Sequence, residues 1–428
     1  MQQPQNVKKY LSSQNNFKWK IETTNKKLYS NIIVIPAKLE FENVKKLIES
    51  ISKNSTEYLK ETLLVFVVNN LLSDSSEIKS DNKKLLTFLR QLNNKKINIG
   101  IIDASSKNKE LPEKEGGVGL ARKIGMDLSL NYFNYSNNSN KKIIISLDAD
   151  CTVSENYLET IVTEFNKNNY SAGYVNFKHP LPISNKEQMA IINYEIFLRY
   201  YVLSLKYANS HYAFHTIGST IISDFESYIK VGGMNKRKAG EDFYFMEKLA
   251  KIADIKKIKH ATVYPSARVS NRVPFGTGKR IEKFIKNKQN EYLLYSGKSF
   301  EVLKSWLEIF HERKLTGKEY LEEAKRINKS LYTFLSEQKF VNNWDKIIAN
   351  SKTEKQLKKQ KLMWMDGFKT LKLIHYLRDN EFPQEKMFQS LDSLFTKMEI
   401  KNKIRNKSDI PPLSVQKDYL TLLQEIDS

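Results

Sequence analysis

Short apolar runs alternate with segments of helical periodicity from about residue 31 onward. The apolar runs at 31–37, 62–70, 95–105 and 141–150 each end in polar residues, whereas 41–53 and 117–133 carry apolar residues at helical spacing. Strands that alternate with helices predict a parallel sheet covered on both faces. Ligands of such sheets gather outside the carboxyl ends of the strands. The pattern therefore predicts an α/β fold with its site at that edge.

The order of elements changes after the fourth strand. The sequence predicts a strand at 171–182, a long helix at 185–208, a strand with a short helix and a glycine turn at 215–233, and a helix at 240–252. From about residue 278 the chain is almost wholly amphipathic helix. We predict a polar N-terminal arm at 1–28, an α/β domain at 29–290 and an α-helical domain at 291–428.

The net charge of +22 is spread along the chain as lysine mixed with asparagine and isoleucine. This distribution is typical of an AT-rich genome, and no DNA-binding or RNA-binding motif accompanies it, so no nucleic-acid partner is expected. A phosphate-rich substrate or an acceptor at a membrane surface stays compatible with the charge. The helical region could contact a membrane through its lysines or form a homodimer.

Cysteine content and hydropathy indicate the cellular compartment of the protein. The single cysteine, Cys151, excludes an internal disulfide and fits a reducing compartment. The first residues have no apolar core of signal-peptide length, and no window of about 18 apolar residues occurs. We therefore expect a cytoplasmic protein without a membrane span, with peripheral contact at the inner face of the membrane as an option.

Two carboxylates, Asp148 and Asp150, directly follow the isoleucine run of the fourth strand. At this spacing they could hold Mg²⁺ or Mn²⁺ and leave coordination positions for substrate phosphates. Asp-X-Asp alone is a weak signal, because it also occurs by chance in acidic loops. All four predicted strands end in polar residues at the same edge of the sheet, which favours a ligand-binding site there. Besides the two aspartates, these strand ends comprise Pro36 to Glu40, Asn69, Asn70 and Asp103.

Glu241 and Asp242 open the helix at 240–252. Carboxylates at a helix start can simply complement the helix dipole. A carboxylate positioned by the fold can also act as a general base toward an attacking hydroxyl. Both interpretations stay open for this pair.

Two further segments suit an anion. The glycine cluster at 116–125 has Arg122 where a dinucleotide-binding fingerprint needs its third glycine, so we interpret it as a close approach to a ligand with Arg122 on the first helical turn. The loop at 267–280 contains Arg268 and Arg272 and could clamp a diphosphate, although such loops are often only solvated.

These segments, in this order, resemble the family 2 glycosyltransferases of the GT-A fold. The matching stretches are "IVIPAKLE", "VVNN", "IIDAS", "GVGLARKIG", "SLDADCTV", "VGGMN" and "GEDFYF", which span about residues 29–280. The resemblance implies a GT-A nucleotide-sugar-binding fold. It also implies metal-assisted transfer of a sugar, with inversion, from a nucleoside diphosphate sugar to an acceptor hydroxyl of a glycan or a lipid-linked molecule. The helical region matches no family.

The resemblance also implies roles for individual residues. Asp148 and Asp150 match the DXD motif that binds Mn²⁺ or Mg²⁺, and Asp242, with Glu241 beside it, matches the catalytic base. Many relatives have a further metal-binding histidine where this chain offers only Ser270 or Asn271. The residues that correspond to donor-binding positions are Pro36, Ala37, Glu40, Asn69, Asn70, Asp103, Gly119, Arg122, Asp148, Arg268 and Arg272.

The acceptor side is the least defined part of the prediction. We expect it within residues 176–220 together with the helical region, and the polar candidates there are His179, His215 and Ser219. A histidine is more commonly structural than functional, so each of these assignments competes with a structural interpretation.

Two other functions compete with sugar transfer. A sugar-1-phosphate nucleotidyltransferase has a related sheet, but needs a glycine-rich loop with Arg and Lys directly after the first strand, where this chain has "PAKLEFEN". A non-catalytic basic binding protein with a transferase-like fold is the second alternative. The retained carboxylate pairs at 148–150 and 241–242 argue against that second alternative.

Overall fold

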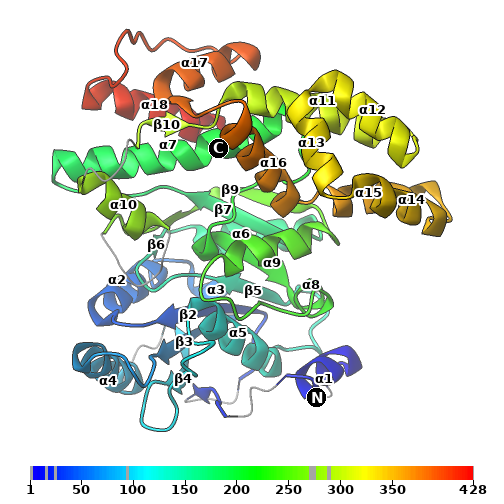
Figure 1. Cartoon of the computed structure of the whole chain (residues 1–428). Coiled ribbons are helices and arrows are strands. Elements are labelled where there is room, and N and C mark those ends of the chain that lie inside the picture. The colour runs from blue at the N-terminus through cyan, green and yellow to red at the C-terminus, as the bar shows by residue number, and fades with distance from the viewer. Residues whose placement is uncertain are drawn as a thin grey trace. The chain divides into compact units, whose positions relative to one another are not determined.

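The computed structural model describes residues 3–14, 18–23, 27–92, 96–268, 276–286 and 291–427 (Figure 1). The chain divides into two compact units. Unit 1 comprises Met1–Pro180 and Thr216–Gly276, and unit 2 comprises Leu181–His215 and Thr277–Asp427. The predicted boundary at residue 290 differs from this division, because the segment at 181–215 belongs with the C-terminal helices.

Unit 1 contains the sheet and the helices beside it. Its helices, including two 3₁₀ turns (η), are α1 (Gln5–Ser12), α2 (Phe41–Ile51), α3 (Thr56–Lys60), α4 (Ser76–Gln91), α5 (Val118–Ser129), η1 (Leu130–Tyr132), α6 (Tyr157–Lys167), η2 (Gly218–Thr220), α8 (Phe225–Lys230) and α9 (Glu241–Ala250). Its strands are β1 (Glu22–Thr23), β2 (Asn31–Ala37), β3 (Thr62–Asn69), β4 (Asn98–Ala104), β5 (Ile143–Ser146), β6 (Thr152–Val153), β7 (Ala172–Phe177), β8 (Ile221–Asp224) and β9 (Ile255–Tyr264).

The described strands of unit 1 form one sheet in the order β1-β4-β3-β2-β5-β8-β7-β9-β6. The four predicted strands β2, β3, β4 and β5 are parallel, and Asn31 of β2 lies opposite both Thr62 and Ile143. β8 runs antiparallel to β5 and β7. The four parallel strands therefore end at one edge of the sheet, as the sequence predicted.

Helices cover both faces of this sheet. On one face, α2, α4 and α6 join strand residues such as Ile33 and Phe66 in a buried apolar cluster. On the other face α5 lies so close that a Cβ on Gly125 would come within 2.3 Å of Val34. Burial on both sides explains why β2 and β3 are almost continuous apolar runs rather than alternating ones.

The N-terminal segment differs from the predicted loose arm. The described residues 3–14 contain α1, and Tyr10 on this helix is buried. Its hydroxyl donates a hydrogen bond of 2.7 Å to Asp127 of α5, which also accepts one of 2.7 Å from Tyr228 and pairs with Lys123 at 3.0 Å. A polar stretch can pack in this way because a few buried side chains are enough to anchor a short helix.

Unit 2 is helical apart from one two-stranded pairing of β10 (Leu293–Leu294) with β11 (Glu385–Lys386) among its described residues. Its helices are α7 (Asn185–Tyr207), α10 (Thr277–Ile285), α11 (Gly297–Glu312), α12 (Gly317–Ile327), α13 (Lys329–Glu337), α14 (Phe340–Asn350), α15 (Glu354–Trp364), α16 (Gly367–Asn380), α17 (Met387–Lys397) and α18 (Leu413–Ile426).

The long helix α7 forms part of the core of unit 2. Ile196, Tyr200 and Leu203 of α7 join one buried cluster with Trp306 and Phe310 of α11. Buried polar contacts add to this packing, since Arg199 pairs with Asp427 at 2.8 Å.

The predicted α/β fold with a mostly parallel, mixed sheet and a helical C-terminal region is confirmed. No helix among the described residues is long and apolar enough to cross a membrane.

Replacing Tyr10 tests whether α1 is docked. Tyr10→Phe should lower the free energy of unfolding by about 1.5–3 kcal/mol, because the lost hydrogen bond reaches a buried carboxylate. The matched control Tyr58→Phe, which removes a 3.4 Å contact with Thr163 near the surface, should change it by less than about 0.5 kcal/mol. Urea unfolding followed by circular dichroism measures both values. An unchanged stability of Tyr10→Phe would contradict the docked helix.

Candidate active site

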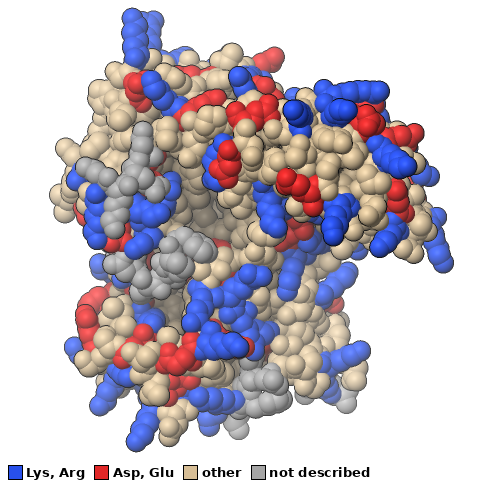
Figure 2. Space-filling view, viewed as in Figure 1, with Lys and Arg blue, Asp and Glu red and all other residues tan. Residues whose placement is uncertain are grey.

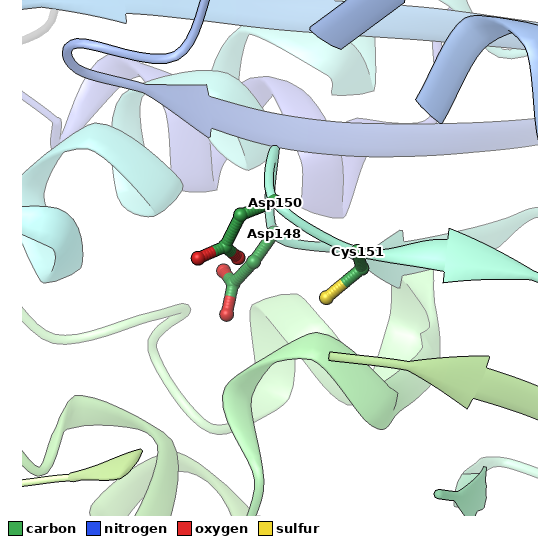
Figure 3. A group of neighbouring side chains, drawn as sticks. All are labelled: Asp148, Asp150 and Cys151. Atoms are coloured by element: carbon green, nitrogen blue, oxygen red, sulfur yellow. The ribbon is translucent and has the colours of Figure 1, made fainter. Parts of the chain in front are cut away.

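The loop after β5 brings the two predicted metal ligands to the carboxyl edge of the sheet. Asp148 and Asp150 are partly buried, and Figure 3 shows their carboxylates projecting to the same side of the chain. One oxygen of each carboxylate and the sulfur of Cys151 all lie within 4.8 Å of one another. Two carboxylates this close suit one divalent cation.

Arg122 joins this loop to the start of α9. Its side chain is buried, and its guanidinium donates one hydrogen bond to Asp148 and another to Glu241. Gly218 makes this arrangement possible, since a Cβ there would lie only 2.4 Å from the guanidinium. The sequence predicted Arg122 as a donor-binding residue, whereas in the structure its contacts are with the two carboxylates that it holds in place.

A second arginine pairs with the other aspartate. Arg268 donates two hydrogen bonds to Asp150, at 3.0 and 3.2 Å, and also pairs with Glu40 in the loop after β2. Its side chain keeps 33% of its exposure, whereas that of Glu40 keeps 4%. Arg268 therefore links the β2 loop to the aspartate pair and stays accessible to a ligand.

The predicted base, Asp242, lies in the first turn of α9. Gly240 precedes the helix with a φ of 72°, a left-handed conformation that favours glycine over residues with a Cβ. Glu241 is buried and Asp242 is partly buried. Burial, followed by the adjacent Glu241 carboxylate, raises the pKa of Asp242 to about 7, although Arg122 acts in the opposite direction. A carboxylate with such a pKa suits general-base work near neutral pH.

Cys151 is the third group beside the two aspartates. Burial, with Asp150 and Asp148 next in importance, raises the pKa of its thiol well above the ordinary value. A protonated thiol is a poor metal ligand, so the two carboxylates are the better ligands. Ser219, which the sequence predicted on the acceptor side, is buried and hydrogen-bonds to this thiol.

The balance of charge at the site favours a cation. Two guanidinium groups, those of Arg122 and Arg268, face a larger number of carboxyl groups. The carboxyl groups connected to them by ion pairs or electrostatic contacts are those of Glu40, Asp148, Asp150, Glu241 and Asp242. These seven described side chains carry a net charge of about −3 when all are ionised, because five carboxylates oppose two guanidiniums. A divalent metal fits this set of oxygen ligands.

Other residues that the sequence predicted to bind the donor lie at the same edge of the sheet. Pro36 and Ala37 end β2. Asn69 donates to the carbonyls of Ala37 and Val67, and so ties the ends of β2 and β3 together. Asn70 is buried and accepts a hydrogen bond of 3.0 Å from the side chain of Asn82. Both asparagines therefore have a structural role that accounts for their position without a ligand.

Asp103 is the second-last residue of β4, just before a loop rich in serine and lysine. Its carboxylate accepts backbone hydrogen bonds from Ser105 and Ser106, and pairs with Lys109 at 3.2 Å. Burial acts to raise the pKa of Asp103, but these hydrogen bonds outweigh it and lower that pKa to about 2. Asp103 is thus fully ionised at neutral pH.

Gly119 packs against the loop before α9 and does not border an open space for a ligand. A Cβ at this position would lie 2.2 Å from the backbone oxygen of Arg237, in the loop before α9. The glycine predicted for a ligand approach therefore allows α5 to pack against that loop. This contact helps Arg122, one helical turn later, to reach Glu241.

The other predicted residues lie in different surroundings. His179 is buried in unit 1, with its ring edge-on to Phe177. His215 belongs to unit 2, where it is buried and its Nε2 lies 2.8 Å from Asp427, a contact that explains it structurally. Arg272, Ser270 and Asn271 lie outside the described residues.

Sequence reasoning missed the glycine that accommodates Arg122. Gly218 belongs to a turn with no motif of its own, and only its contact with the guanidinium reveals its importance. A weak signal did exist for the buried state of Arg122, because Leu120, Ala121 and Ile124 lie near it on a helix that packs against the sheet. A buried arginine needs carboxylate partners, but the sequence could not say which ones.

No family model and no curated protein matches the sequence. Among solved structures, TarS 1-349 of S. aureus is 11% identical over 76% of this chain and 93% of that one, with a TM-score of 0.38. The mannosyltransferase PcManGT of Pyrobaculum calidifontis, in complex with GDP-Man and Mn²⁺, is 11% identical over 81% and 93%, with a TM-score of 0.37.

Removing Arg122 should destabilise unit 1. Arg122→Met leaves Asp148 and Glu241 without their shared cation, and the Glu241 side chain is only 4% exposed. We expect a loss of about 3–5 kcal/mol in the free energy of unfolding. The control Lys236→Met removes an exposed ion pair with Glu115 and should cost less than about 1 kcal/mol. Equal stabilities of the two variants in urea unfolding would contradict the bridging role.

Proposed function

We propose that unit 1 is a GT-A-type glycosyltransferase that moves a sugar from a nucleoside diphosphate sugar to an acceptor hydroxyl with inversion. One observation carries the proposal: Arg122 brings Asp148 of the DXD sequence and Glu241 of the ED sequence together. The resemblance to the family 2 glycosyltransferases implies that these two carboxylate pairs, which are far apart in the chain, form one site. A chance acidic turn would have no reason to meet the start of α9.

The donor is proposed to bind at the carboxyl ends of β2 to β5. Asp148 and Asp150 would hold a divalent metal, Mn²⁺ or Mg²⁺, which when bound neutralises the diphosphate and makes it a better leaving group. Arg268, whose side chain is 33% exposed, is accessible enough to contact a phosphate. The loop of Pro36, Ala37 and Glu40, with Asp103, would line the nucleotide.

Asp242 is proposed as the general base. Its partly buried carboxyl has the raised pKa that lets it accept a proton from an attacking hydroxyl near neutral pH. Glu241 positions it, because Glu241 is fixed by Arg122 and is the preceding residue of the same helix. One base and one displacement at the sugar carbon imply inversion of the anomeric configuration.

The acceptor is proposed to be a hydroxyl of a glycan or of a lipid-linked molecule. His179 and Ser219 stay as proposed acceptor-side residues of unit 1. His215 is not included, because Asp427 already accounts for its imidazole.

The alternative of a sugar-1-phosphate nucleotidyltransferase is disfavoured by the loop after β2. That chemistry needs a glycine-rich loop with free cations for the phosphates. Here the loop has no glycine, and Lys38 pairs with Asp74 at 2.6 Å. The released products also separate the two functions, since transfer yields a nucleoside diphosphate and nucleotidyl transfer yields pyrophosphate.

Incubation with a panel of sugar nucleotides and Mn²⁺ tests the proposal. We expect one donor to release its nucleoside diphosphate, and Asp150→Asn to lower this rate at least about 100-fold, since it removes a metal ligand. Asp254→Asn, which changes an aspartate with 73% side-chain exposure, should leave the rate unchanged. If no donor is turned over, or if both variants behave alike, the proposed site is wrong.

The pH dependence tests Asp242. A base works only when deprotonated, so kcat/KM should rise with pH through about 7, the pKa of this carboxyl, and then level off. Asp242→Asn should remove this limb of the profile together with most of the activity. A profile that falls across this range as the pH rises would be inconsistent with Asp242 as the base.

The configuration of the product tests the single displacement. Proton NMR of the first product formed should show the anomeric configuration opposite to that of the donor sugar. Retention would refute the role of Asp242 as the base of an inverting reaction.

A further inference from the structure

Two consecutive helices of unit 2, α15 and α16, carry both exposed lysines and exposed apolar side chains. On α15, Lys355, Lys359 and Met363 follow one another at a spacing of four residues and so lie along one side of the helix. On α16, Phe368 and Lys372 have the same spacing, and the Lys372 ammonium lies 4.6 Å from the centre of the Phe368 ring. We call these two helix sides together, with Lys358 of α15, the α15–α16 surface.

The apolar members of this surface are unusual for the molecule. Most large hydrophobic side chains are buried, and only six are exposed among the described residues. Phe368 is the one aromatic residue among these six, and Met363 is another member; both are 37% exposed. They are only five positions apart, at the turn between two helices. Unlike Leu181 and Ile183, which are also exposed and close in sequence, these two residues come from helices that carry exposed lysines.

The lysines of this surface are not neutralised by the described protein. No ion pair within the described residues includes Lys355, Lys358, Lys359 or Lys372. Between residues 352 and 372 the chain has seven lysines and only two acidic residues, Glu354 and Asp366. Asp366 is occupied in capping α16. Figure 2 shows lysine and arginine side chains projecting around α14 and α15.

Exposed lysines together with exposed apolar side chains fit one partner best. We propose that the α15–α16 surface docks on an anionic lipid bilayer. The lysines face the lipid phosphates, and Met363 and Phe368 enter the boundary between headgroups and acyl chains. A nucleic acid would also attract the lysines, but it offers no apolar layer for the exposed methionine and phenylalanine. The contact is peripheral, because no described helix could span a membrane.

The contact would be electrostatic at long range and apolar at short range. Each lysine near an anionic surface contributes about fivefold to the partition coefficient, so three together contribute about 100-fold. Salt screens this part over about 10 Å at 0.1 M. The apolar part is insensitive to salt.

Cosedimentation of the full chain with vesicles tests the proposal. The probes are vesicles of phosphatidylglycerol mixed with phosphatidylcholine, and vesicles of phosphatidylcholine alone. We expect binding only to the anionic vesicles. The variant with Lys355→Gln, Lys358→Gln and Lys359→Gln should lose about 100-fold in affinity. The variant with Met363→Ser and Phe368→Ser should also bind more weakly, and its remaining binding should disappear at high salt.

The matched control removes the same charge elsewhere in unit 2. Lys401, Lys403 and Lys407 are exposed in the segment between α17 and α18, and changing these three to Gln should reduce binding much less. Circular dichroism verifies that every variant is folded. Equal losses in the two triple variants would show that only overall charge matters, and would overturn the proposal.

Two other results would also overturn the proposal that the α15–α16 surface docks on an anionic bilayer. One is the absence of binding to anionic vesicles. The other is tighter binding of a duplex oligonucleotide, lost in the α15 triple variant but kept in the Met363 and Phe368 variant, which would make this a nucleic-acid surface. Vesicle binding is measured without donor or acceptor, so its outcome is independent of the proposed transferase activity.

Discussion

The buried ion pairs of Arg122 hold together the two parts of the chain on which the site depends. Asp148 follows β5, whereas Glu241 opens α9, and one guanidinium contacts both. A buried charge without a partner is costly, so the arginine and its two carboxylates constrain each other's positions. Because Asp148 belongs to the proposed metal site and Glu241 is adjacent to the proposed base, this one side chain fixes the position of the proposed base relative to the proposed metal site.

The packing around Arg122 shows how the fold makes room for this contact. Gly218 leaves space for the guanidinium, and Gly119 lets α5 approach the loop before α9. The excess of carboxylates over arginines then leaves negative charge at the edge of the sheet. That charge is what a divalent metal, and through it a diphosphate, would use.

The strands and their common edge could be predicted from the sequence because burial on both faces gives nearly continuous apolar runs. The positions of Asp148, Asp150, Glu40 and Asp103 at that edge follow from the same pattern. The partners of Arg122 could not be predicted, since contacts between distant segments leave no local signal. The division into units was also missed: α7 follows the strands in the chain, but its apolar side chains complete the core formed by α11 and its neighbours.

The central claim is that this edge binds a nucleoside diphosphate together with a divalent metal, and thermal unfolding in the presence of both measures it most directly. Ligands that bind the folded state raise its stability by about 2.7 kcal/mol at 100 times Kd. The account predicts that one nucleoside diphosphate with Mn²⁺ raises the melting temperature more than the sum of each alone, and that Asp148→Asn with Asp150→Asn abolishes this gain. No shift with any nucleoside diphosphate and Mn²⁺, or an equal shift in the double variant, would contradict it.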